Sequence, residues 1–86
     1  MDPSTYYAEL RNKGFLVDGN ESYLLGLAMI VCNMHDAGYD DDGPIGDYIA
    51  RRENIPNIKG YDIALYADVY VCTQLHPRLL PPTSPP

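Results

Sequence analysis

Both cysteines and both histidines of the chain fall into two short segments, Cys32-Asn33-Met34-His35 and Cys72-Thr73-Gln74-Leu75-His76. Residues three or four apart share one face of a helix, so each pair can direct its sulfur and its ring nitrogen to the same side. Two thiolates and two imidazoles are the donors of a tetrahedral zinc site. The spacing therefore makes Cys32, His35, Cys72 and His76 a candidate structural zinc site.

A simpler interpretation of the same four residues needs no cofactor. Free cysteine is among the most buried residue types, and the helix dipole favours histidine near the C-terminal end of a helix. The long interval between the pairs also departs from common zinc-finger patterns. We expect this interpretation to prevail over zinc binding. We expect no disulfide between Cys32 and Cys72, because thiols stay reduced in the cytoplasm.

An acidic segment, residues 36–47, forms the second candidate site and holds five of the nine aspartates. An EF-hand loop begun at Asp36 would need glycine and glutamate where Asp41 and Asp47 stand, so its ligand geometry fails. Negative charge beside tyrosine is typical of a surface that attracts a basic protein. The predicted protein-binding residues are Tyr39, Asp40, Asp41, Asp42, Asp47 and Tyr48. The alternative is a solvated loop in which Asp42 caps the next helix.

The aromatic composition supports a binding surface. The chain has 8 tyrosines, one phenylalanine and no tryptophan. The tyrosines occur on every predicted element, and a small core cannot easily satisfy so many hydroxyl groups. We therefore expect several tyrosines to be exposed, as they often are in protein interfaces.

Charge and length narrow the classes of function. Six basic against 12 acidic side chains give a net charge of −6 over 86 residues, which argues against binding along a nucleic-acid backbone. Residues 49–63 loosely resemble a helix-turn-helix, but Glu53 and Gly60 stand where apolar residues belong, and Lys59 is the one basic residue of the second helix. No nucleophile elbow, phosphate-binding glycine loop or zinc-protease motif is present, so we expect no enzyme.

The elements that must position these residues are four predicted helices at residues 3–13, 21–37, 44–53 and 58–75. Gly14 and Gly38 are the expected stops of the first two, and Gly26 predicts close approach of a neighbouring backbone. The side chains that we expect the fourth helix to bury are Ile58, Tyr61, Leu65, Val69, Cys72 and Leu75. Alternation of apolar residues leaves a strand at 61–75 as the alternative, which would make the domain α+β.

The predicted fold is all-α, a small four-helix domain at residues 1–76 followed by an extended Pro-rich tail at 77–86. In an up-and-down bundle the second and fourth helices would run parallel, which brings the two Cys–His pairs to one end. The apolar helix at 21–37 also predicts a homodimer through that helix.

The start of the chain does not resemble a signal peptide, and the apolar run at 23–32 is too short to span a membrane, so we expect a cytoplasmic protein without a membrane partner. The predicted function is a non-catalytic protein-binding module that inhibits or modulates a larger protein with a basic surface. In its build the chain resembles small phage inhibitors, such as anti-CRISPR proteins, and immunity proteins. A regulator or accessory subunit derived from a helix-turn-helix is the alternative, and a zinc-stabilised domain is the third.

Overall fold

The protein is described by a computed structural model for residues 1–75, and the predicted tail at 77–86 lies outside the described residues. Four helices, α1 (Ser4–Asn12), α2 (Glu21–Asp36), α3 (Asp42–Glu53) and α4 (Asn57–Ala67), carry the fold. The last of these continues without a break into a π-helical segment, η1 (Asp68–Cys72), and a short α5 (Thr73–Leu75). The all-α prediction is confirmed, and the strand at 61–75 is wrong because the described residues contain no strand.

A residue in the left-handed backbone conformation, with positive φ, follows each of the first three helices. Gly14 has φ +87° and Gly38 has φ +104°, at the two stops that the sequence predicts. The third stop is Asn54, with φ 57°, a conformation that asparagine tolerates better than most residues. Helix α3 is capped by Asp41, whose carboxylate accepts a hydrogen bond from the Gly43 amide at 3.0 Å. The prediction that Asp42 is the cap is therefore wrong, and the Asp42 side chain serves elsewhere.

The buried face of the fourth helix differs from the prediction. Ile58, Tyr61 and Val69 are exposed, with relative exposures of 65%, 39% and 46%. Cys72 is buried as predicted, but the rest of the buried face is made by Gly60, Asp62, Ile63, Ala64, Ala67 and Val71. Gly60 lies inside because α3 and α4 approach closely at this position, whereas Ile58 and Tyr61 lie on the outer face.

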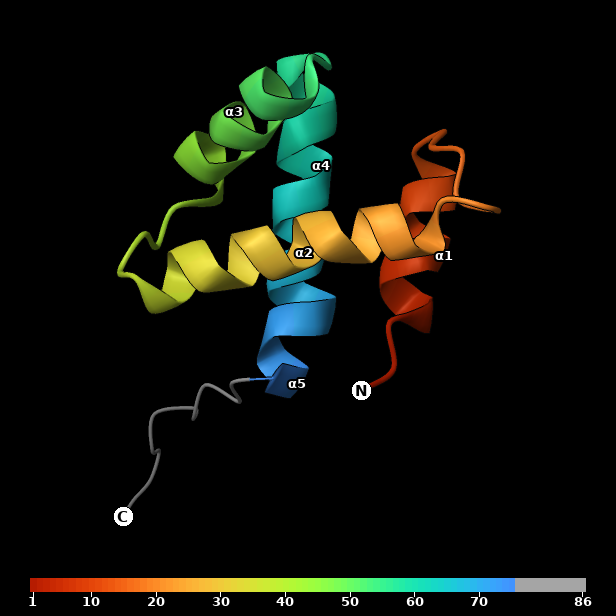
Figure 1. Ribbon diagram of the computed structural model, residues 1–86, viewed down its shortest axis with the longest axis horizontal. Coiled ribbons are helices and arrows are strands. Elements are labelled where there is room, and N and C mark those ends of the chain that lie inside the picture. The colour runs from red at the N-terminus through yellow and green to blue at the C-terminus, as the bar shows by residue number, and fades with distance from the viewer. Residues whose placement is uncertain (76–86) are drawn as a thin grey trace.

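The helices cross and do not form a parallel bundle. In Figure 1, α2 lies across α4 and η1, and α3 lies beside α4 after a tight turn. Helix α1 packs against α4 and η1, and in Figure 1 it lies at the N-terminal end of α2. The expectation that the second and fourth helices run parallel is wrong, but the crossing still brings the C-terminal half of α2 to η1. The core between the helices includes Tyr6, Leu10, Val31, Ile45, Ile49, Ile63 and Val71.

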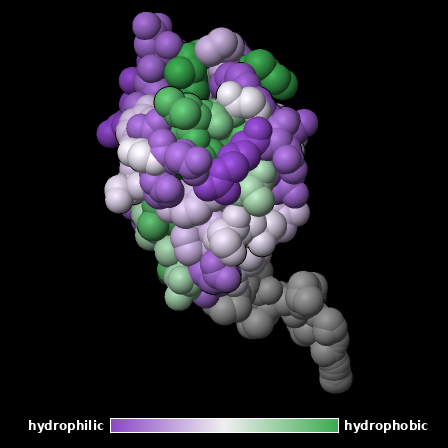
Figure 2. All heavy atoms as spheres, turned by 90° about the vertical axis from the view of Figure 1, so that its right-hand side faces the viewer, coloured by the Kyte–Doolittle hydropathy of each residue, from purple (hydrophilic) through white to green (hydrophobic). Residues whose placement is uncertain are grey.

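The surface on the α1 side mixes residue types. Figure 2 shows this face, where hydrophobic groups gather in the upper half and hydrophilic groups surround them.

Among the described residues, no helix has the length and apolar character needed to cross a membrane. The expectation of several exposed tyrosines is confirmed, since Tyr23, Tyr39, Tyr48 and Tyr61 are all at least 39% exposed.

Candidate functional site

The two cysteines are joined to each other. The Cys32 and Cys72 sulfurs are 2.07 Å apart, and both residues are buried, with exposures of 2% and 4%. In this bond neither sulfur is a thiolate, so the predicted Cys₂His₂ zinc site does not form in the oxidised chain. The expectation that the cysteines stay unpaired is also wrong in this structure. The remaining predicted ligand, His76, lies outside the described residues.

His35 lies in a small polar cluster that the sequence did not predict. Its side chain is 6% exposed, and its Nε2 atom lies 3.0 Å from Asp42 Oδ1 and 3.6 Å from Asp68 Oδ1. The three residues come from the last turn of α2, the first residue of α3 and the first residue of η1. Three separate elements therefore converge on this cluster, which we call the His-Asp-Asp cluster (His35, Asp42 and Asp68).

The electrostatics of the His-Asp-Asp cluster are dominated by partial burial of negative charge. Burial, followed by a hydrogen bond to Asp68 and the charge of that residue, raises the pKa of Asp42 to about 6. His35 acts in the opposite direction by a hydrogen bond and by its charge. Asp42, predicted to lie on the protein-binding surface, thus faces inward instead, with 15% of its side chain exposed.

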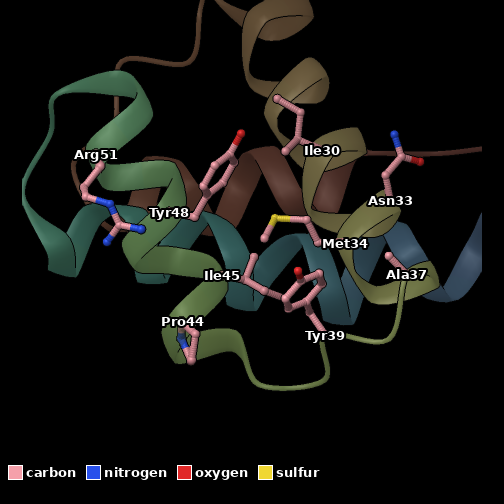
Figure 3. Close-up of a pocket in the computed structure, with 9 residues that line it drawn as sticks. All are labelled: Ile30, Asn33, Met34, Ala37, Tyr39, Pro44, Ile45, Tyr48 and Arg51. Carbon is pink, nitrogen blue, oxygen red and sulfur yellow. The ribbon is translucent and has the colours of Figure 1, made fainter.

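A groove between α2 and α3 is the second feature, and it has a volume of about 510 Å³. In Figure 3, Met34 extends from α2 toward Tyr48 on α3, and the ring of Tyr39 lies beside Ile45. Apolar and aromatic side chains form most of its walls. The lining residues are Ile30, Asn33, Met34, Ala37, Tyr39, Pro44, Ile45, Tyr48 and Arg51.

The predicted protein-binding residues therefore divide between two places. Tyr39 and Tyr48 both line the groove, although nine positions separate them in the chain. Asp40 and Asp41 are exposed on the loop that follows Tyr39, and Asp47 is half-buried on α3 beside Tyr48 in sequence. Asp42 alone leaves this surface and joins the His-Asp-Asp cluster.

Helices α3 and α4 carry the segment whose sequence loosely resembles a helix-turn-helix, and they pack against each other. Lys59 donates a hydrogen bond from Nζ to the Lys13 carbonyl at 2.5 Å, and the same atom lies 4.7 Å from the centre of the Phe15 ring. The basic residue that could meet a phosphate is therefore used within the fold. The outer face of α4 presents Ile58 and Tyr61, which carry no positive charge.

Sequence reasoning missed Asp68 and the groove residues of α2. A signal for Asp68 was present, because it is the one charged residue between positions 63 and 75 of an otherwise largely apolar helical stretch. A charge in such a place usually has a partner, which here is His35. Ile30 and Met34 lie four residues apart on α2. They gave a weaker signal because α2 is apolar on most of its sides, so no single face stands out.

Comparisons with protein-family models, with curated proteins and with solved structures found no match to this chain.

Proposed function

We propose that this protein is a non-catalytic binding module whose α2–α3 groove takes up an apolar side chain from a basic segment of a larger protein. The observation that carries the proposal is the groove, an apolar hollow of about 510 Å³ with Tyr39 and Tyr48 in its walls. Such a volume accommodates one or two large side chains of a partner. Buried anchor side chains in aromatic pockets supply much of the binding energy in protein interfaces.

The charge beside the groove supports a basic partner. Asp40 and Asp41 are exposed next to Tyr39, and the chain as a whole carries a charge of −6. Charge of one sign around a binding site accelerates encounter with the opposite sign and matters less for the final affinity. By occupying such a surface the protein would inhibit or modulate its partner, as phage-encoded inhibitors such as anti-CRISPR proteins and immunity proteins do.

The test is capture of a partner from cells of the natural host on the immobilised full chain, followed by mass spectrometry. We expect one stoichiometric protein, with binding weakened at least tenfold by Tyr39→Ala and by Tyr48→Ala. Both side chains are well exposed, so neither substitution should unfold the domain. Leu16→Ala is the matched control, because Leu16 is 75% exposed in the loop at the opposite end of α2.

Two outcomes would count against the proposal. A partner that binds the Tyr39→Ala/Tyr48→Ala double variant as tightly as the parent protein uses a different surface. An association rate that does not change between low and high salt contradicts electrostatic attraction, because screening by salt should slow the encounter of opposite charges.

A second candidate, a protein-contacting regulator derived from a helix-turn-helix, is supported by the outer face of α4. Ile58, Tyr61, Leu65 and Val69 follow each other at intervals of three or four residues, and three of them are exposed. Ile58→Ser with Val69→Ser would abolish binding by this face and spare binding by the groove. A DNA fragment shifted at low salt would instead support a regulator that retains DNA contact.

The compartment and the oligomeric state stay predictions. The disulfide weighs against the predicted cytoplasmic location, since such bonds persist mainly in oxidising compartments. Alkylation of free thiols in intact cells, followed by a gel-shift assay, would decide whether Cys32 and Cys72 are bonded there. Light scattering would test the predicted homodimer through the apolar helix α2.

A further inference from the structure

The His-Asp-Asp cluster has the donor atoms of a metal centre. One nitrogen from His35 and one oxygen each from Asp42 and Asp68 lie within 4.8 Å of one another. The imidazole is the most deeply placed of the three, with 6% of its side chain exposed, and its Nε2 atom faces both carboxylates. The cluster is therefore more than an acidic patch, because a buried imidazole lies between its two carboxylates.

The distances from the imidazole to the two carboxylates are compatible with a shared metal ion. Zinc binds nitrogen and carboxylate oxygen at about 2.0–2.2 Å, so two ligands of one ion lie roughly 3.0–3.6 Å apart. The distances from His35 Nε2 to the Asp42 and Asp68 oxygens are 3.0 and 3.6 Å. An ion could thus enter with only small rotations of the side chains, and its two positive charges would balance two carboxylates held close together.

The disulfide fixes two of the three ligands relative to each other. Cys32 precedes His35 by three residues on α2, and Cys72 follows Asp68 by four residues in η1. The covalent bond and the His35–Asp68 contact therefore join the same two elements at neighbouring positions. Asp68 also begins the π-helical segment, and π-helical turns are frequent at functional sites.

We propose that His35, Asp42 and Asp68 form a binding site for one divalent transition-metal ion of the zinc type. A mixed set of one imidazole and two carboxylates suits zinc, cobalt(II), manganese(II) or iron(II) better than calcium, which prefers oxygen ligands alone. Three protein ligands leave at least one coordination position for water. The site differs from the Cys₂His₂ site that the sequence predicted, because it uses no sulfur.

The experiment uses the full chain with its disulfide intact, after dialysis against a chelator. Titration with zinc by calorimetry should saturate at one equivalent, and cobalt(II) should give visible absorption bands of a bound ion. His35→Gln and Asp68→Asn should each weaken zinc binding at least tenfold. Asp40→Asn is the matched control, since this exposed aspartate precedes Asp42 by two residues but lies outside the cluster, and it should change the affinity less than twofold.

A second readout guards against variants that fold poorly. Zinc should raise the melting temperature of the parent protein and of Asp40→Asn, and it should leave that of His35→Gln unchanged. Circular dichroism before titration confirms that each variant is helical. If Asp68→Asn is unfolded, His35→Gln and Asp42→Asn carry the same comparison.

Three results would overturn the proposal. The first is the absence of both zinc heat and cobalt absorption in the oxidised protein. The second is equal loss of affinity in Asp40→Asn and Asp68→Asn, which indicates diffuse binding to the acidic loop. The third is binding only after reduction, with a strong near-ultraviolet thiolate-to-cobalt band, which would restore the site formed by Cys32 and Cys72.

Discussion

Gly46 of α3 and Gly60 of α4 lie against each other with no space for a side chain on either residue. A Cβ atom at Gly60 would collide with the Gly46 carbonyl oxygen and lie 2.8 Å from the Ala50 Cβ. A Cβ atom at Gly46 would lie 2.6 Å from the Tyr61 Cα. This contact sets the close approach of α3 and α4, and α3 in turn carries Asp42 and Tyr48 toward α2.

Substitution of either glycine should therefore destabilise the domain. We expect Gly46→Ala or Gly60→Ala to lower the free energy of unfolding by about 1–3 kcal/mol, because backbone atoms must move apart. Urea unfolding followed by circular dichroism measures the change. Gly26→Ala is the control, since nothing lies within 4 Å of its added Cβ, and it should raise stability by about 0.5–1 kcal/mol. A Gly60→Ala variant as stable as the parent would contradict the close contact.

The disulfide should contribute a large part of the stability of so small a domain. It closes a loop with a sequence separation of 40, for which the chain-entropy model gives a stabilisation of about 4 kcal/mol. We expect Cys32→Ala/Cys72→Ala to lower the free energy of unfolding by about 2–4 kcal/mol. Urea unfolding with and without a reductant provides the measurement. The parent protein should respond to the reductant and the double variant should not, so an unresponsive parent would contradict the bond.

Local signals in the sequence predicted the helices well but not their arrangement. Gly14 and Gly38 mark helix ends because only glycine adopts their backbone conformation at little cost. The sequence gives no comparable signal for which face of a helix is buried. Ile58 and Val69 follow the helical period, yet both are exposed, and the close α3–α4 contact requires Gly60 on the inside instead. Gly26, predicted to allow close approach, has open space beside it.

The candidate sites are also predicted only in part, because the sequence indicates which residues share a helix but not which helices cross. The position of Tyr39 and Tyr48 beside the acidic segment predicts a shared binding surface, and both residues line one groove. The spacing on helices singles out Cys32, Cys72 and His35, but their expected nearness rests on parallel helices, whereas α2 in fact crosses η1 where the two cysteines meet. The pairing within the site depends on how α2 crosses η1. That crossing bonds the cysteines to each other and gives His35 the neighbour Asp68, which local spacing cannot reveal.

Lys59 should stabilise the attachment of α4 to the loop after α1. Its ammonium group donates to the Lys13 carbonyl and lies over the Phe15 ring. Lys59→Met keeps most of the aliphatic stem and removes both interactions, so we expect a loss of about 1 kcal/mol in the free energy of unfolding. Lys13→Met, at an exposed position, should change stability by less than half of that amount. Equal effects of the two substitutions in urea unfolding would argue against a specific role for Lys59.

Tyr6 should make the domain sensitive to alkali. Its side chain is fully buried and its hydroxyl donates to the Leu24 carbonyl at 2.7 Å, so burial raises its pKa well above the ordinary value of 10.0. In the unfolded chain the same hydroxyl loses its proton near pH 10, while the folded protein still holds it. The unfolded state therefore binds fewer protons above pH 10, and stability present below that pH is lost as pH rises, by up to about 1.4 kcal/mol per pH unit.

The Tyr6→Phe variant isolates this contribution. At neutral pH it should be about 1 kcal/mol less stable than the parent, because it lacks the hydrogen bond from α1 to α2. Between pH 9 and pH 11 its free energy of unfolding should fall less steeply than that of the parent, since the groups that still titrate are common to both proteins. Parallel stability curves for the two proteins over this range of pH would show that the Tyr6 hydroxyl is not held protonated by burial.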